Sequence, residues 1–350
     1  MTMPQNSRPA PPTQLRIGLW GPPGSGKTTY LAALNVATTR RPDGVGSWIM
    51  SGLDDVSTSF LDRSTHQLTT QRTFPVATQQ ETNMLFRFTG EREVVRRSKI
   101  GRRLVEMEPI AFELDVLDVP GAMYDNPSRE QGQEQHVNVP GPGGPPVADR
   151  QHAPPLSLME QENRLIDHLQ MCHGIVYLFD PERDSLEQDA FRYFHPVLNR
   201  LTERMMSQSH ISRAKLPHHV AVCVTKFDQP NIHRHAQVKG YTVSDEQPPF
   251  LPRVPNEGAA DFFKLLCSDP QSNSDLVEKG LRQHFNTLNY FITSSIGFYV
   301  PGNRFRLHDS MNVERVGPGH EGVRIKGRIY PINVLEPLLW LYESILPARP

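Results

Sequence analysis

The stretch GPPGSGKT at residues 21–28 has the spacing G-x-x-x-x-G-K-T, which combines three glycines, a lysine and a threonine. Glycines let a backbone wrap closely around an anion, so that successive amide N–H groups and the N-terminus of a following helix point at it. The Lys27 ammonium can then reach terminal phosphates, and the Thr28 hydroxyl can bind magnesium. The pattern predicts a phosphate-binding loop made of Gly21, Pro22, Pro23, Gly24, Ser25, Gly26, Lys27, Thr28 and Thr29.

A second motif follows the alternating run FELDVLD at 112–118, where Asp118 and Gly121 form D-x-x-G. A carboxylate at the end of a strand beside the phosphate loop can hold the water shell of magnesium, and a glycine three residues later can bring its N–H to a γ-phosphate. The same residue types also form ordinary turns. We expect Asp118 near the metal and Gly121 near the γ-phosphate.

Two further apolar runs end in polar residues. HVAVCV at 219–224 precedes Thr225-Lys226-Phe-Asp228, and FIT at 291–293 precedes Ser-Ser-Ile-Gly at 294–297. With these motifs in this order, the chain from Leu15 to about Gly297 resembles the translation-factor-class (TRAFAC) P-loop GTPases.

That resemblance implies a role for each residue. In such a family Asp228 accepts hydrogen bonds from guanine N1 and the exocyclic amine, the aliphatic stem of Lys226 packs over the base, and Thr225 takes the polar position before the lysine. It also implies that a backbone N–H of a small-residue loop reaches guanine O6, the loop being Ser294, Ser295 and Ile296.

The family also places a threonine before the second strand, where it meets magnesium and the γ-phosphate. Thr73, Thr78 and Thr82 are the available residues, and we choose Thr78 because the preceding Pro-Val-Ala resembles the family loop best. Arg72 lies nearby and is a candidate arginine finger, although loop arginines are more often simply solvated. Ala122 follows Gly121 where Ras-like enzymes have a water-orienting glutamine, which predicts slow intrinsic hydrolysis or water positioning by another residue or a partner.

Composition restricts the class of protein. The net charge of −1 and pI near 6.9 do not indicate nucleic-acid binding through overall charge, although a local basic patch stays an open alternative. The 3 cysteines are scattered, so neither a disulfide framework nor a zinc spacing is visible, and a cytoplasmic location is expected. No apolar run is long enough for a transmembrane segment.

Short apolar runs that alternate with helical patterns predict an α/β fold of the P-loop NTPase type. This is a three-layer αβα arrangement with a mostly parallel six-stranded sheet, helices on both faces and long loop insertions. The expected strands are 15–20, 83–90, 109–117, 174–179, 219–224 and 290–296, and the expected helices 27–39, 53–70, 156–171, 184–206, 259–267, 275–289 and a last one capped by Asn333. Residues 1–13 are expected to be a disordered tail, and 14–350 a GTPase domain with insertions at about 126–155, 229–257 and 301–328.

Two basic features invite functional interpretations. The arginines and lysine between Arg96 and Arg103 fall where two strands should turn back, so a solvated hairpin tip is favoured over a patch for an acidic partner. His218-His219 and His233-Arg-His235 contain metal-compatible side chains without a complete ligand set, and surface loops are favoured for them.

Together these features predict a GTP-binding protein with slow, Mg2+-dependent GTP hydrolysis that switches between GTP and GDP states around Thr78 and Asp118. The long insertions resemble those of bacterial double-GTPase or conflict-system GTPases, which implies a protein effector or a second GTPase as partner. Two alternatives stay open: a P-loop ATPase, and a scaffold that holds nucleotide without hydrolysing it.

Overall fold

A computed structural model of the chain describes residues 15–40, 48–75, 82–97, 103–118, 158–208, 215–309, 311–317 and 322–346. For some residues inside these ranges, Asp118 among them, only the backbone is described. The first half contains β1 (Arg16–Trp20), α1 (Lys27–Thr39), β2 (Trp48–Gly52), α2 (Asp55–His66), a π-helical turn (Gln67–Gln71), β3 (Thr82–Arg97), β4 (Arg103–Asp118), α3 (Leu158–Gln170) and β5 (Gly174–Phe179). The second half contains α4 (Pro181–Glu187), α5 (Ala190–Ser207), β6 (Leu216–Val224), α6 (Pro230–Val238), β7 (Val243–Ser244), β8 (Pro252–Arg253), α7 (Asn256–Leu266), α8 (Ser274–His284), β9 (Phe285–Ile292), a 3-10 turn (Leu307–Asp309), β10 (Val313–Val316), β11 (Gly322–Ile325) and α9 (Glu336–Ile345).

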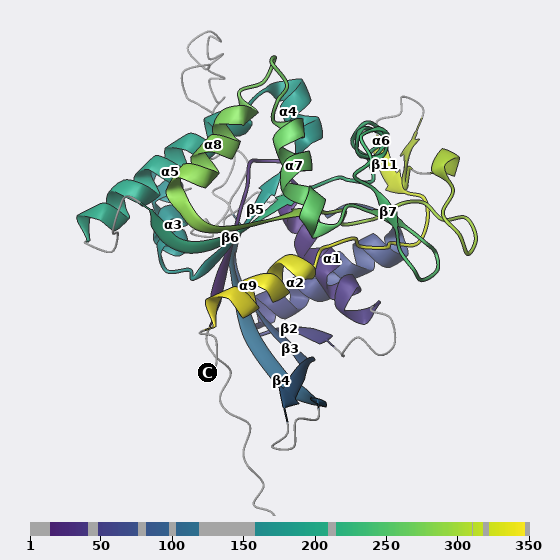
Figure 1. Cartoon of the computed structure of the whole chain (residues 1–350), viewed down its shortest axis with the longest axis horizontal. Coiled ribbons are helices and arrows are strands. Elements are labelled where there is room, and N and C mark those ends of the chain that lie inside the picture. The colour runs from purple at the N-terminus through teal and green to yellow at the C-terminus, as the bar shows by residue number, and fades with distance from the viewer. Residues whose placement is uncertain are drawn as a thin grey trace, which may run out of the picture.

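The central sheet has seven strands in the order β2-β3-β4-β1-β5-β6-β9 (Figure 1). Strands β4, β1, β5, β6 and β9 run parallel, whereas β2, β3 and β4 pair antiparallel. The expected α/β fold with a mainly parallel sheet is therefore confirmed. The expected number of strands was too low, because β2 is a five-residue edge strand whose run WIMSG is too short to show a clear period.

Alternate residues of the central strands face two separate cores. On β5, Ile175 and Tyr177 join the core that includes α3, α5, α7 and α8, whereas Val176 and Leu178 join the core that includes α1, α2 and α9. This alternation follows from the two-residue period of a strand. The sheet therefore has helices on both faces, as Figure 1 shows.

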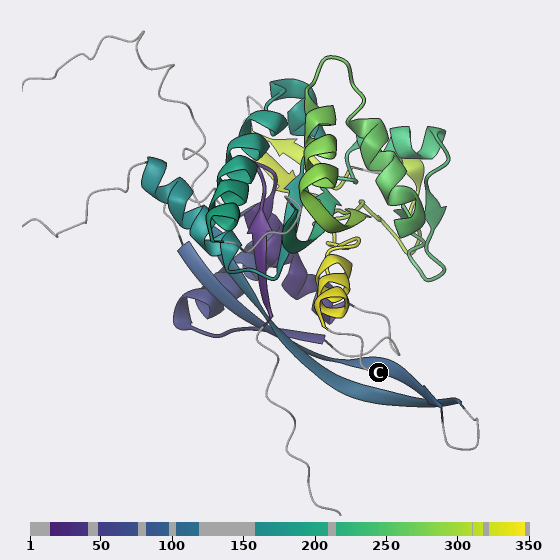
Figure 2. The ribbon, with the colours of Figure 1, turned by 60° about the vertical axis from the view of Figure 1, so that its left-hand side comes forward.

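Strands β3 and β4 form a hairpin that extends beyond the rest of the sheet (Figure 2). Each strand has 16 residues, and their pairing runs from Thr82 opposite Asp118 to Arg97 opposite Arg103. The two strands therefore turn back where the basic run predicts a hairpin, although the tip itself lies outside the described residues.

Several predicted boundaries were wrong. The single helix expected over 184–206 is two helices, because Gln188 adopts a left-handed backbone (φ 55°) between α4 and α5. The helix expected over 275–289 ends at His284, and the chain continues directly as β9. Asn333 does not cap α9; its side-chain amide donates to Ile292 O at 3.0 Å, and α9 begins only at Glu336.

Two of the histidines assigned to surface loops are buried. His218 lies in β6, where Nε2 is 3.0 Å from Leu169 O, and burial lowers its pKa to about 4. His233 lies in α6, with its ring against Phe227 and Phe298. The surface prediction for these two histidines was wrong because histidine has no strong burial preference and the local sequence carried no other indication of burial.

The regions expected as insertions differ in content. Residues 229–257 contain α6 and the short β7–β8 pair, and 301–328 contain the β10–β11 hairpin, whereas 126–155 lie outside the described residues. No helix in the described ranges has the length and apolar character that a bilayer crossing requires.

Candidate nucleotide-binding site

Four loops meet at the carboxyl edge of the parallel strands. They follow β1, β5, β6 and β9, which are neighbours in the sheet. Parallel strands place their carboxyl ends at the same edge, and ligands of open α/β sheets bind there. The predicted phosphate loop and both predicted base-contact segments follow three of these strands, so the structure brings them together.

The phosphate loop connects β1 directly to α1, which begins at Lys27. Lys27 is buried, and its Nζ donates to Gly21 O at 2.9 Å and Pro22 O at 3.0 Å. Gly26 precedes α1 with a left-handed backbone (φ 90°). The buried Ser25 Oγ makes no hydrogen bond within the described part of the chain. The loop thus curls around the lysine, with the N-terminus of α1 behind it.

The Thr-Lys-Phe-Asp segment is held on both sides by neighbouring strand ends. Thr225 donates to Phe179 O from its backbone N–H (2.8 Å) and from its hydroxyl (3.2 Å). Phe227 N–H donates to Thr293 O at 3.0 Å. These bonds hold Lys226 in a left-handed conformation (φ 58°), which is uncommon for a residue with a side chain and is typical of functional sites.

The Lys226 ammonium makes an ion pair with a buried carboxylate. Its Nζ lies 2.6 Å from Asp180 Oδ2, although the geometry is not that of a hydrogen bond. Asp180 Oδ1 accepts hydrogen bonds from the N–H groups of Glu182 and Arg183, each at 3.1 Å, and so caps α4. The pair lays the Lys226 stem across the end of β5.

Asp228 is fully buried, and its Oδ1 accepts a hydrogen bond from the Ser294 hydroxyl. Burial raises the pKa of Asp228 to about 6, and the bond from Ser294 opposes that rise. A buried carboxylate with acceptor capacity left over favours a ligand that presents N–H donors. The same carboxylate penalises a ligand that presents a lone pair.

Ser294 acts differently from the expectation. Its N–H donates to Ile332 O at 3.0 Å and its carbonyl accepts from Ile332 N–H at 2.8 Å, so its backbone is already paired. Its hydroxyl donates to Asp228 and accepts from Gly297 N–H at 2.8 Å. Ser294 therefore orients the carboxylate. Within the expected loop, Ser295 and Ile296 stay predicted as the source of a backbone N–H for the base.

Residues just before β10 and just after β11 support this loop from outside. Tyr330 N–H and the Asn312 side chain both donate to Ile296 O, at 3.0 and 3.1 Å. Gly297 has φ 66°, and a Cβ there would lie 2.0 Å from Tyr330 O. Only glycine fits at this close approach of two backbones.

The remaining predicted residues are only partly placed. Thr78 and Gly121 lie outside the described residues. Asp118 is the last residue of β4, which pairs with β1, so its backbone stands at the edge where the phosphate loop begins. The Arg72 guanidinium donates to Lys326 O at 3.0 Å, and its arginine-finger role stays a prediction.

Sequence reasoning missed Asp180 and Arg183, which lie after β5 at the same edge. The signal was present, because a six-residue apolar run is followed by Asp-Pro, a pattern typical of a helix N-terminus. Their approach to the site depends on strand order, which the local sequence does not encode.

The predicted contact between Asp228 and a guanine base implies that base binding depends on pH. A guanine donates to Asp228 only when the carboxylate is ionised, so a proton and the base compete. With a pKa of about 6, affinity is full above that pH and falls as pH drops through it, by about tenfold between pH 7 and pH 5. Calorimetric titration with GDP at several pH values measures this, and Asp228→Asn, whose side chain at position 228 does not titrate, is the control. An equal pH dependence in both proteins would contradict the assignment.

Comparison with known proteins gives structural likeness alone. No protein-family model matches the chain, and no curated protein does. It is similar to the Arl6 BBS3 small GTPase from Trypanosoma brucei with bound GppNp (TM-score 0.31, 11% identity, 95% of this chain and 98% of that one). It is also similar to the signal recognition particle receptor SRb-GTP/SRX complex from Chaetomium thermophilum (TM-score 0.31, 14% identity, 83% of this chain and 94% of that one). A third similar structure is sup35 complexed with GDP (TM-score 0.28, 10% identity, 84% of this chain and 40% of that one).

Proposed function

We propose that this protein binds guanine nucleotides and hydrolyses GTP slowly, as a nucleotide-dependent switch. The observation that carries the proposal is the buried Asp228, oriented by Ser294 at the same sheet edge as the G-x-x-x-x-G-K-T loop. The loop supplies the phosphate site and the carboxylate supplies the base site.

Guanine fits this carboxylate better than adenine. Guanine presents N–H donors at N1 and at its exocyclic amine, and an ionised carboxylate is an acceptor only. Adenine presents a lone pair at the corresponding ring nitrogen, so it would give the buried Asp228 carboxylate no donor beyond the Ser294 hydroxyl and would set a lone pair against it. A buried acceptor left without its ligand donors costs about 1–3 kcal/mol, more when it is charged, which favours a GTPase over the ATPase alternative.

Magnesium fits the donors that the chain offers. The hydroxyl of Thr28, in the first turn of α1, and the carboxylate of Asp118 are the hard oxygen ligands that Mg2+ prefers. Thr78 is proposed as a third ligand. Held by these residues, the ion would supply positive charge beside the phosphates during transfer to water.

The chain's own residues supply mainly electrostatic stabilisation. Lys27 and the backbone N–H groups of the loop bind the phosphates, and Gly121 is proposed to sense the γ-phosphate. Since Ala122 stands in place of a water-orienting glutamine, intrinsic hydrolysis is expected to be slow. A switch in bacterial signalling or conflict, with an effector or second GTPase as partner, is the biological role we propose.

Identification of the nucleotide that co-purifies with the protein tests the proposal. After denaturation and ion-exchange separation, GDP or GTP is expected in near one-to-one ratio with the chain. Co-purification of an adenine nucleotide would overturn the proposal. It would also be overturned if ATP displaced a bound fluorescent GDP analogue as well as GTP does. Hydrogen exchange of the protein with GDP bound and with a GTP analogue bound distinguishes a switch from a scaffold. Equal protection of residues 74–82 and 120–126 in both states would favour the scaffold.

A further inference from the structure

Arg183 lies against the phosphate-binding loop although no recognised motif includes it. A Cβ on Gly24 would lie 3.2 Å from Arg183 Nη1 and 4.0 Å from its Cδ. Gly24 is the fourth residue of the loop and has a left-handed backbone (φ 68°). The guanidinium therefore reaches the loop from the β5–α4 connection.

The orientation of this guanidinium is determined by Asp189. Arg183 Nη2 donates to Asp189 Oδ2 at 2.6 Å, and Nε donates to Asp189 Oδ1 at 3.3 Å. This two-point pairing occupies the Nε–Nη2 edge and leaves Nη1 as the nitrogen beside Gly24. The ring of Tyr193 lies below, with its centroid 5.8 Å from Arg183 Cζ.

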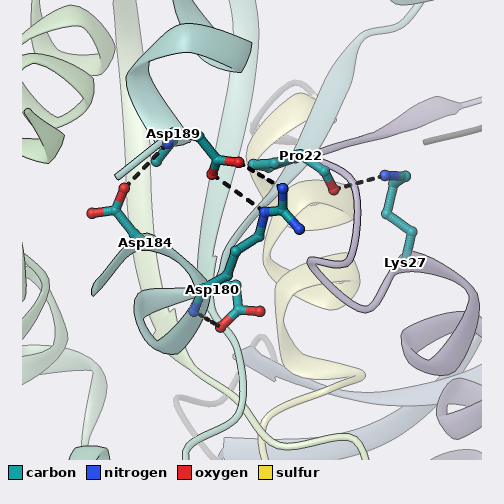
Figure 3. Close-up of polar contacts among 7 residues, drawn as sticks. Pro22, Lys27, Asp180, Asp184 and Asp189 are labelled. Atoms are coloured by element: carbon teal, nitrogen blue, oxygen red, sulfur yellow. Dashed lines mark hydrogen bonds and ion pairs between the residues drawn. The ribbon is translucent and has the colours of Figure 1, made fainter. Parts of the chain in front are cut away.

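The backbone around Arg183 is held as firmly as its side chain. Asp180 accepts from Arg183 N–H at 3.1 Å, and Asp184 Oδ1 accepts from Ala190 N–H at 3.1 Å, which closes the turn between α4 and α5. Figure 3 shows Asp180, Asp184 and Asp189 gathered beside the loop that carries Pro22 and Lys27. A guanidinium held in this way loses little freedom when it binds an anion.

We propose that Arg183 is an additional phosphate ligand, which binds the α- and β-phosphates through Nη1 and slows nucleotide release. The proposal rests on the proposed nucleotide site. Loops of this type cradle the α- and β-phosphates with their backbone N–H groups, and Arg183 stands beside that backbone. An ion pair that only joined α4 to α5 would not require a nitrogen turned to the loop. Arginine in this setting makes strong charge-assisted hydrogen bonds to phosphate.

The test compares GDP with guanosine, which has no phosphates. In Arg183→Ala, GDP affinity is expected to fall by about ten- to a hundredfold, the loss typical of one charge-assisted hydrogen bond, and a fluorescent GDP analogue to dissociate correspondingly faster. Guanosine affinity should stay unchanged. Asp189→Asn keeps the Arg183 guanidinium but weakens the ion pair that orients it, so a smaller loss of GDP affinity is expected.

Arg192 provides the matched control, because its guanidinium also lies over the Tyr193 ring, at 5.9 Å, but its side chain is exposed. Arg192→Ala should leave both affinities unchanged. Thermal unfolding is measured first, and Arg183→Lys, which loses the planar fork, is used if the alanine variant does not fold.

Equal losses for GDP and guanosine in Arg183→Ala would overturn the inference, since Arg183 would then only support the fold. Unchanged GDP affinity would overturn it as well, provided that Lys27→Ala weakens GDP. If Lys27→Ala also has no effect, the proposed nucleotide site itself is wrong, so the two failures are distinguishable.

Discussion

In Asp228→Asn, GTP affinity is expected to fall by a factor on the order of a hundred to ten thousand, with a gain of affinity for xanthosine nucleotides. Two charge-assisted hydrogen bonds from the base are lost, each of about 1.5–3 kcal/mol. Xanthine presents a carbonyl where guanine has its exocyclic amine. The side-chain amide of the variant can donate to that carbonyl while its oxygen accepts from N1–H. Competition titrations with GDP and XDP measure the change of preference.

The burial of Asp228 makes this prediction sharp. Because the carboxylate is out of water and already held by Ser294, it cannot turn to solvent when the base is wrong. Asp261→Asn, on the exposed face of α7, is the matched control and should leave both affinities unchanged. If Asp228→Asn bound GTP as the wild type does, the base site would have to lie elsewhere.

Lys27→Ala is expected to reduce affinity for GTP and GDP by about 10- to 150-fold while leaving guanosine affinity unchanged. The phosphates lose a cation that contributes about 1.5–3 kcal/mol as a charge-assisted hydrogen-bond donor. In the described structure Lys27 Nζ donates to two loop carbonyls. The ammonium group is therefore already inside the loop, and nucleotide binding would turn its donors toward the phosphates. Calorimetry with a non-hydrolysable GTP analogue measures the loss.

Lys264→Ala is the control for this variant, because Lys264 is exposed in the last turn of α7. Preserved nucleotide affinity in Lys27→Ala, with an unchanged melting temperature, would remove the basis for a phosphate site at residues 21–28. A loss that extends equally to guanosine would indicate a disturbed fold.

The sequence predicted those elements whose bounds are determined by their own residues. Helix α1 has the bounds that the sequence indicated, Lys27–Thr39, because glycines precede it and a run of apolar, helix-favouring residues follows. The run at 174–179 was also predicted with its observed bounds, as a fully apolar strand. The Thr-Lys-Phe-Asp segment was correctly placed after β6 for the same reason.

Features that depend on contacts between distant residues could not be predicted. The side chain of Asn333 bonds to Ile292 instead of capping α9, and the backbone of Ser294 pairs with Ile332 instead of facing the site. Arg183 meets Gly24 only because β5 lies next to β1. In each case a partner more than 35 positions away decides the role, and its position follows from strand order.

Residues 312–317 and 322–332 bear on where the proposed nucleotide-binding unit ends. The last recognisable motif stops at Gly297, yet Ile332, Tyr330 and Asn312 hold the loop before it in place. Within the same residues, Ile325 N–H donates to Arg72 O at 2.8 Å, and Arg72 precedes Thr78 in the sequence. A domain border drawn after the final motif would thus separate the proposed base-contact loop, and Arg72, from residues that hydrogen-bond to them.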